Sequence, residues 1–186
     1  ESGCRFKLDP RVTYFSVRES TERERIISQI TGPEDVLVLF GGIGPFPICI
    51  SKKRPDVTAL SIELNPDAHR YCLENIRLNK LEGRVSAILG DVREVAPSLG
   101  KQFDRVLTPL PKGAYLFLDV IVPTVKPGGI LHHYHWASDL DSYSEAYTLV
   151  DEAAAKYGRK TEFLGGVRVA KYSPRVSKVR IDVRIY

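Results

Sequence analysis

The stretch Val36-Leu37-Val38-Leu39-Phe40-Gly41-Gly42-Ile43-Gly44-Pro45-Phe46 decides the fold class of this chain. It begins as an apolar run, which predicts a buried strand, and ends in a glycine-rich turn. Glycine has no Cβ, so the backbone of such a turn can take positive φ and come close to a ligand. A strand that leads into a turn of this kind is typical of the nucleotide site of an open α/β sheet.

A second apolar run, residues 57–62, ends in the acidic residue Glu63 about twenty residues after the glycine turn. A carboxylate at this position can accept hydrogen bonds from both hydroxyls of a ribose. The glycine turn and the acid together therefore predict a bound cofactor of the adenosine type.

The rest of the chain alternates between strand and helix patterns. We expect strands over 36–40, 57–62, 85–89, 103–107 and 130–134, and helices over 48–52, 67–79, 114–122 and 142–157. Strands separated by helices imply right-handed crossovers and a parallel sheet. The last two apolar runs, 167–172 and 179–185, predict an antiparallel pair at the edge of that sheet.

The first thirty residues follow a different pattern. Residues 4–8 and 12–15 alternate and predict a short hairpin across Asp9-Pro10. Thr21 with Glu24 three residues later has the pattern of a capping box and predicts a helix that begins there. We expect residues 1–30 to pack on the domain formed by residues 31–186, so that the chain makes one compact domain overall.

Composition sets further bounds. No apolar run approaches the roughly 18 residues that a membrane span needs, and the net charge of +4 permits a nucleic-acid partner without demanding one. The three cysteines lack the spacing of a metal site, so we expect free buried thiols and a cytoplasmic protein. Because the sequence contains no methionine, we expect a fragment from which N-terminal domains are missing.

The glycine turn does not match a dinucleotide fingerprint, because Pro47 stands where the third glycine of G-x-G-x-x-G would be. This departure counts against NAD. Two other polar loops, Gly90-Asp91-Val92-Arg93 and Pro109-Leu110-Pro111-Lys112, follow the third and fourth predicted strands. They should meet Glu63 at the carboxyl edge of the sheet, where open α/β folds bind their ligands. Asp91 could accept from an adenine amino group there, or it could simply cap a helix.

Several of these stretches, in this order, resemble the archaeal and eukaryotic tRNA (guanine-N(1))-methyltransferases that act on the nucleotide 3′ of the anticodon. The matching stretches are residues 14–25 (Tyr-Phe-Ser-Val-Arg-Glu-Ser-Thr-Glu-Arg-Glu-Arg), 40–46, Glu63-Leu64-Asn65-Pro66, 74–80, 90–93 and Leu110-Pro111-Lys112. The block at residues 14–25 discriminates best, since generic methyltransferases lack it. The resemblance implies a Rossmann-like class I methyltransferase fold, S-adenosylmethionine as cofactor, and the anticodon region of tRNA as partner of a monomeric enzyme.

The resemblance also assigns roles to residues. Glu22 would be the general base, with Arg23 as its neighbouring cation, and the fourth-strand loop would bring Pro109 and Lys112 to the reaction centre. Guanine N1 carries a proton, so a carboxylate must remove it, and a nearby cation can stabilise the negative charge that develops. The cofactor would contact Tyr14, Arg18, Phe40, Gly42, Gly44, Glu63, Leu64, Asp91 and Val92, with Glu63 at the ribose and Asp91 at the adenine.

Two departures from the family pattern matter most, and a third, Val17 for the usual proline, is milder. Val38 stands where the family usually has an acid, and Pro109 where it usually has asparagine. Two alternatives therefore stay open: an aminocarboxypropyltransferase of the wybutosine pathway, which shares the scaffold, and a catalytically weakened module that binds cofactor or RNA.

Two other groups of residues attract attention. His132, His133 and His135 lie close in sequence, but no cysteine or close acidic partner completes a metal site, so we expect none. In a strand, His133 and His135 would share one face while His132 points the other way. Basic residues recur towards the end of the chain and could contact phosphates: Arg159, Lys160, Arg168, Lys171, Arg175, Lys178 and Arg180. Lys112, beside the expected site, is the better candidate for an RNA contact.

Overall fold

The computed structural model describes residues 1–138 and 143–186, and these fall into two compact units, residues 1–95 and 96–186. Residues 1–30 belong to the same unit as residues 31–95. That the whole chain forms one compact domain stays a prediction.

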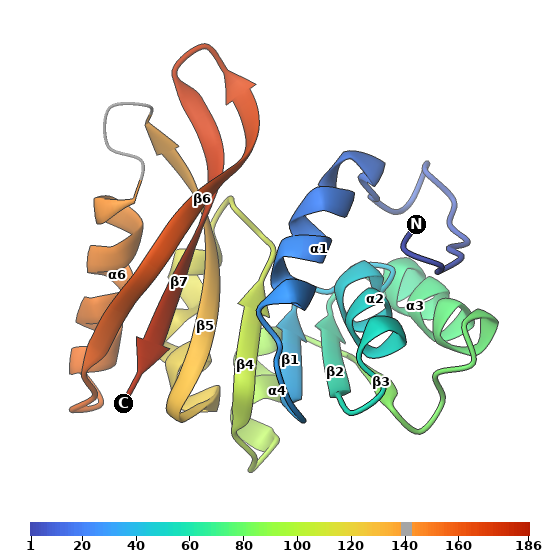
Figure 1. Ribbon diagram of the computed structural model, residues 1–186, viewed down its shortest axis with the longest axis horizontal. Coiled ribbons are helices and arrows are strands. Elements are labelled where there is room, and N and C mark those ends of the chain that lie inside the picture. Colours follow the sequence, from blue (N-terminus) through green and yellow to red (C-terminus); the bar gives the residue numbers. More distant parts are fainter. Residues whose placement is uncertain (139–142) are drawn as a thin grey trace. The chain divides into compact units, whose positions relative to one another are not determined.

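The first unit is a parallel three-stranded sheet with helices (Figure 1). Its elements in chain order are the 3₁₀ turn η1 (Val17–Glu19), α1 (Ser20–Ser28), β1 (Asp35–Leu39), α2 (Pro45–Lys53), β2 (Thr58–Glu63), α3 (Pro66–Leu78) and β3 (Val85–Leu89). The strand order is β3-β2-β1, and both pairings are parallel. In β1, residues 36–39 are fully buried, as expected of a strand that is covered on both faces.

Two of these helices begin as their sequences predict. Pro45 and Pro66 stand in the first turns of α2 and α3, where the missing N–H costs nothing. The Asn65 side chain caps α3 by accepting a hydrogen bond from Asp67 N at 2.9 Å. The carboxyl ends of β1 and β2 thus run directly into helix N-termini.

The predicted N-terminal hairpin is wrong. Residues 1–16 contain no strand, because their backbone groups bond to the side chains of two asparagines in and after α3. Lys7 N donates to Asn75 Oδ1 at 2.7 Å, and Arg5 N donates to Asn79 Oδ1 at 2.9 Å. Side-chain amides thus satisfy the groups that a partner strand would have paired.

The predicted capping box is also wrong. The helix α1 continues from η1 and begins at Ser20, so Thr21 already lies inside it, and Glu19 stands at the N-cap without capping the helix through its side chain. Glu24, the expected second half of the box, instead accepts a hydrogen bond from Ser2 Oγ. The helix therefore begins from the preceding 3₁₀ turn η1 and not from a cap at Thr21.

The second unit is a four-stranded sheet of order β4-β5-β7-β6. After α4 (Val92–Ser98), which runs across the boundary, come β4 (Phe103–Thr108), η2 (Ala114–Phe117), α5 (Leu118–Ile121), η3 (Val122–Thr124), β5 (Val125–Ser138), α6 (Ser144–Ala155), β6 (Thr161–Ser173) and β7 (Val176–Ile185). β4 and β5 are parallel, whereas β7 pairs antiparallel with both β5 and β6. The expected mostly parallel sheet with an antiparallel C-terminal edge is confirmed.

Several boundaries in this unit differ from the predictions. The predicted helix 114–122 is three short helical pieces. The strand predicted over 130–134 is longer, because β5 already includes residues 125–129, where the pairing with β4 shifts register. Helix α4 was not predicted. Residue 142, the expected first residue of the helix now seen as α6, lies outside the described residues.

Candidate active site

Glu63 is fixed from both sides at the carboxyl end of β2. Its Oε2 accepts a hydrogen bond from Gly42 N at 2.7 Å, and its Oε1 accepts one from Asn65 N at 2.8 Å. A carboxylate has about four acceptor positions, so these two bonds leave capacity for two more. The side chain is thus a preoriented acceptor, as binding of a ribose diol requires.

The turn after β1 is shaped for close approach. Phe40 has φ +60° and Gly42 has φ +57°, and a Cβ added to Gly42 would meet nothing within 4 Å. Gly41 is constrained for another reason: a Cβ there would overlap the Ser61 hydroxyl unless that side chain moved. A bulky residue at positive φ is costly, and strain of this kind is concentrated at binding sites.

Gly44 completes the turn by leading into α2. It has φ +88°, and a Cβ there would stand only 2.7 Å from Cys72 Sγ. The predicted contact residues Phe40, Gly42 and Gly44 therefore form one continuous turn, which the Gly42 hydrogen bond ties to Glu63.

The loop that follows β3 (residues 90–93) lies beside Glu63, because Gly90 N donates to Glu63 O at 3.0 Å. Asp91 follows, and its Oδ1 accepts a hydrogen bond from Arg93 N at 2.8 Å in the first turn of α4. Asp91 therefore does act as a helix cap, and contact with adenine stays a prediction. Next to these acids, Leu64 is 65 % exposed whereas Val92 is buried.

Glu22 and Arg23 are both buried in the first turn of α1. The carboxylate of Glu22 lies 3.4 Å from Arg25 Nη1. The guanidinium of Arg23 pairs with Glu1, donates to Ser16 O at 2.9 Å and lies over the Phe15 and Phe46 rings. These contacts give Arg23 a structural role, and its role as a catalytic cation stays a prediction.

Tyr14 and Arg18, expected to close the cofactor pocket, lie on the surface, and Tyr14 is 78 % exposed. The segment that carries them is anchored nearby. Phe6, Leu8 and Phe15 pack against the buried residues Ile43, Ala68 and Tyr71.

Asn75 is a positioning residue that the sequence reasoning missed. Its amide donates to Lys7 O and to Ile43 O, both at 3.1 Å, while its Oδ1 accepts from Lys7 N. One buried side chain thus joins the N-terminal segment to the glycine turn. The signal was present, since a polar asparagine stands at a core-facing position of the α3 pattern, beside Ile76.

The second unit holds the remaining predicted residues. Pro109 and Pro111 are half-buried after β4, and Lys112 is exposed. Just before them, the buried Thr108 Oγ1 lies 3.2 Å from His133 Nδ1. This arrangement anchors the start of the loop to β5 and leaves Lys112 accessible.

The three histidines divide between the two faces of β5, as predicted. His132 Nδ1 lies 2.6 Å from Asp182 Oδ1, and its Nε2 lies 2.6 Å from Arg105 Nη1. Because a guanidinium can only donate, Nε2 must accept, and His132 is the neutral Nδ1–H tautomer. Burial lowers the pKa of His132 to about 4, against the opposing effect of Asp182. On the other face, His133 and His135 stack with ring centroids 6.1 Å apart.

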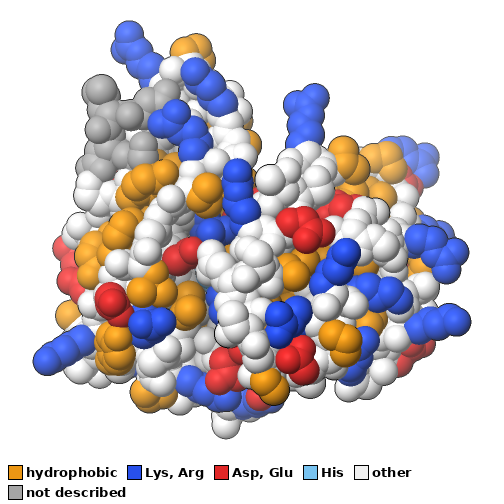
Figure 2. Space-filling view, in the orientation of Figure 1, with side chains coloured by type: hydrophobic (Ala, Val, Ile, Leu, Met, Phe, Trp, Pro, Cys, Tyr) orange, Lys and Arg blue, Asp and Glu red, His pale blue; other side chains and the backbone are white. Residues whose placement is uncertain are grey.

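The basic residues near the C-terminus do not form one surface. Lys178 and Arg180 are buried, and Arg159 donates to the carbonyls of Val122 and Val125. Arg168, Lys171 and Arg175 are exposed on the β6–β7 hairpin, where Lys and Arg side chains gather in the space-filling view (Figure 2).

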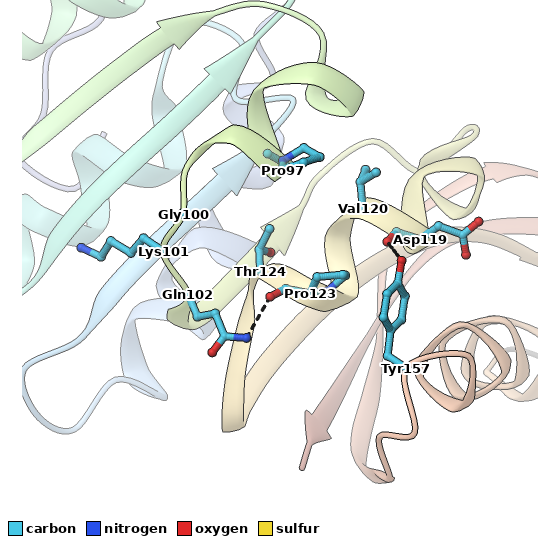
Figure 3. Close-up of a pocket in the computed structure, with 10 residues that line it drawn as sticks. Pro97, Gly100, Lys101, Gln102, Asp119, Val120, Pro123, Thr124 and Tyr157 are labelled. Atoms are coloured by element: carbon cyan, nitrogen blue, oxygen red, sulfur yellow. Dashed lines mark hydrogen bonds between the residues drawn. The ribbon is translucent and has the colours of Figure 1, made fainter.

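A hollow of about 510 Å³ near the start of β4 is a poor candidate for the active site (Figure 3). Its polar groups already bond to one another: Gln102 Nε2 donates to Pro123 O, Tyr157 Oη to Asp119 O, and Thr124 Oγ1 to Ile121 O. It lies by the amino end of β4, whereas open α/β sheets bind ligands at the carboxyl ends.

Comparison with known proteins agrees with this geometry. The family model of the TRM5/TYW2 methyltransferase domain matches residues 1–163. The chain belongs to this family. The Rossmann-like methyltransferase fold is confirmed, since solved structures of this family superpose over the whole chain.

Among its relatives is the tRNA (guanine(37)-N(1))-methyltransferase Trm5b of Pyrococcus abyssi, which is 39% identical over 100% of this chain and 54% of its own length. The crystal structure of that Trm5b superposes with a TM-score of 0.91. The tRNA(Phe) (4-demethylwyosine(37)-C(7)) aminocarboxypropyltransferase of Methanocaldococcus jannaschii is 33% identical over 99% of this chain and 73% of its own length.

Two of the solved relatives are complexes, one with a ligand and one with a partner. M. jannaschii TYW2 in complex with AdoMet gives a TM-score of 0.90 at 32% identity, covering 100% of this chain and 83% of its own. The complex of aTrm5 and tRNALeu gives 0.86 at 33% identity, covering 100% of this chain and 51% of its own. The chain spans about half the length of the curated Trm5b relatives that it matches.

Proposed function

We propose that this chain is the catalytic part of an S-adenosylmethionine-dependent methyltransferase that modifies N1 of the guanine 3′ of the anticodon in tRNA. The proposal rests above all on Glu63, a carboxylate fixed by Gly42 N and Asn65 N at the carboxyl end of β2, where open α/β sheets bind their ligands. It is supported by relatives that are named tRNA (guanine(37)-N(1))-methyltransferase and by solved relatives with AdoMet and with tRNALeu.

The residues present fit an adenosine cofactor. Glu63 keeps acceptor capacity for the ribose hydroxyls, and open space lies over Gly42. The exposed Leu64 side chain offers an apolar surface for a flat ring beside that carboxylate. When bound, S-adenosylmethionine supplies an activated methyl group.

The chain's own residues then have to prepare the guanine. In this proposal Glu22 takes the N1 proton, which makes the ring nitrogen a nucleophile. Arg23 holds the first turn of α1 through Ser16 O and the rings of Phe15 and Phe46, so it positions Glu22. The exposed Lys112 is available for the negative charge of the base or of the RNA backbone.

Calorimetric titration with S-adenosylmethionine tests the cofactor site. Glu63→Gln replaces one oxygen by NH₂, which faces a backbone N–H donor instead of accepting from it. We expect a loss of affinity of roughly 10- to 100-fold, the range for a lost hydrogen bond to a charged group. Asp67→Asn, an exposed carboxylate two residues into α3, is the matched control and should bind as the wild type does. Equal affinity of Glu63→Gln and wild type would contradict the assignment.

Nucleoside mass spectrometry of treated tRNA separates the alternatives. A methyl group on guanosine supports the proposal, whereas an aminocarboxypropyl group supports the transferase activity for which the M. jannaschii relative is named. Cofactor binding without any product supports the weakened module that Val38 and Pro109 suggest. Loss of product in Glu22→Gln, with cofactor affinity retained, is expected if Glu22 is the base.

The proposal also includes a cytoplasmic location and a monomeric state. Cys4, Cys49 and Cys72 are free and buried, which suits the reducing cytoplasm. Among the described residues no helix has the length and apolar character that crossing a bilayer needs. Action as a monomer is a prediction that light scattering in solution can check.

A further inference from the structure

A second hollow, of about 610 Å³, opens beside the loop that follows β4. Its lining includes Lys112 from that loop, Tyr115 and Leu116 from η2, His135 and Trp136 from β5, and Glu145 from α6. All six belong to the second unit, so the hollow is a feature of that unit alone. Its volume lies in the range of small-molecule and nucleotide pockets.

The wall of this hollow carries an unused polar group. The His135 side chain is about nine-tenths buried, and its Nδ1 has no hydrogen-bond partner among the described residues. Its Nε2 lies 3.7 Å from Glu145 Oε1, too far for a direct hydrogen bond. Because Nδ1 is itself enclosed, a polar ligand in the hollow can reach this imidazole only through Nε2, beside Glu145.

The remaining walls suit a flat ring with a charged tail. Tyr115 meets His135 edge to face at 5.9 Å and is still 42 % exposed, and Leu116 beside it is 62 % exposed. These apolar faces offer a stacking surface, while Lys112 offers a cation for a phosphate and Glu145 an acceptor for an amino group. A nucleotide combines all of these complementary features.

The surroundings favour a nucleotide within a polymer over a free one. Trp136 packs on Tyr172 of β6 with ring centroids 4.5 Å apart, and Tyr172 is 72 % exposed. Tyr172 follows Lys171 on the β6–β7 hairpin, whose exposed cations also include Arg168 and Arg175. Strand alternation puts the Trp136 ring on the face of β5 opposite to His135, so the pair of Trp136 and Tyr172 belongs to the hairpin surface and not to the wall that His135 forms. The hairpin (Figure 2) thus adds cations and aromatic rings beside the hollow. Such a series suits a single-stranded nucleic acid, whose backbone follows the cations while its bases stack.

We infer that this hollow binds one nucleotide of the RNA substrate that flanks the modified guanosine. The inference rests on the proposed function, and it adds a subsite with Tyr115 as stacking residue and His135 as the group that reads the base edge. Lys112 lies at the end of the loop that would carry the reaction centre, so the subsite and the modified base are reached from the same loop.

The chain contains a built-in reporter, since Trp136 is its only tryptophan. The test titrates the 186-residue protein, saturated with S-adenosylmethionine, with a hairpin RNA of the tRNA anticodon stem and loop, and follows both Trp136 fluorescence and RNA anisotropy. We expect the RNA to quench Trp136. Tyr115→Ala should weaken RNA binding roughly 5- to 100-fold, the range for one stacked base, whereas Tyr115→Phe should keep most of it.

Two controls separate this inference from the proposed function. Tyr157→Ala removes a similarly exposed tyrosine of the same unit, outside the hollow, and should bind RNA as the wild type does. Tyr115→Ala should bind S-adenosylmethionine normally, which also shows that it is folded.

The inference is overturned if RNA binds without changing Trp136 fluorescence and Tyr115→Ala binds it equally well; the proposed function then stands. It is also overturned if S-adenosylmethionine alone quenches Trp136 and Tyr115→Ala weakens that binding, since the hollow would then belong to the cofactor. If the wild type binds no RNA the inference fails, and the proposed function fails with it only if the cofactor is not bound either.

Discussion

Asn75 offers the sharpest test of how the glycine turn is held. Its side chain makes three hydrogen bonds, to Lys7 N, Lys7 O and Ile43 O, and it is fully buried. Asn75→Ala removes all three. At ~1 kcal/mol for each bond, and about 1–3 kcal/mol for the carbonyl of Ile43 left without a partner, the free energy of unfolding should fall by about 4–6 kcal/mol. For a chain of this size that corresponds to a drop in Tm of roughly 8–24 °C.

Urea unfolding followed by circular dichroism measures this change, and hydrogen exchange of the Lys7 amide reports the local contact. Cofactor affinity should fall as well, because Ile43 stands between Gly42 and Gly44. The control is Arg77→Ala, an exposed position of the same helix, which should stay within about 0.5 kcal/mol of wild type. A loss below ~1 kcal/mol for Asn75→Ala, or unchanged exchange at Lys7, would refute the idea that this side chain joins the two segments.

Three further changes have defined outcomes. Gly41→Ala should destabilise the protein by about 1–3 kcal/mol because the new methyl overlaps the Ser61 hydroxyl, and Ser61→Ala in the same chain should restore most of the loss, as a double-mutant cycle by urea unfolding would show. The pKa of His132 in the folded protein is about 4, below the ordinary 6.5, because the buried ring resists protonation. The stability that the neutral ring contributes is therefore complete above pH 6.5 and is lost as pH falls towards 4, a loss of roughly 3 kcal/mol in the free energy of unfolding. In His132→Gln, stability measured between pH 4 and 7.5 should depend less on pH. Burial raises the pKa of the Cys72 thiol to about 12, so iodoacetamide at pH 8 should label Cys72 only after unfolding, as peptide mass spectrometry can check.

Elements with a strong local signal were predicted well. The strand over residues 85–89 has the predicted bounds, and the helix predicted over 67–79 differs by one residue at each end, because Asn65-Pro66 fixes its start. The prediction of an N-terminal hairpin was wrong because an alternating pattern does not show which group pairs with each backbone N–H and C=O. Helix α4 was missed because it has only seven residues and contains Pro97, which argues against a helix in any sequence pattern.

The spacing of residues along the sequence predicted the part of the candidate site that lies at the ends of β1 and β2. A glycine turn and an acid at the end of the next strand specify Gly42 and Glu63, and the hydrogen bond between them confirms that the two meet. Contacts between distant segments could not be predicted in this way. Neither the pairing of Arg23 with Glu1 nor the arrangement of Tyr115 and His135 around a hollow has a periodic signal in the sequence.

Glu63 and Asp91 show why an acid at a strand end is not by itself a ligand contact. Both stand at the carboxyl ends of parallel strands, and both accept backbone hydrogen bonds, so burial and position do not separate them. The donors do. Glu63 is held by two different loops, which fix its position and use half of its acceptor capacity, whereas Asp91 accepts from its own helix, in the manner of any N-cap. Replacing Glu63 by glutamine should therefore change ligand affinity more than stability. Replacing Asp91 by asparagine, which also caps helices well, should change stability little, so any loss of cofactor affinity in that variant would reveal the contact with adenine that its geometry leaves open.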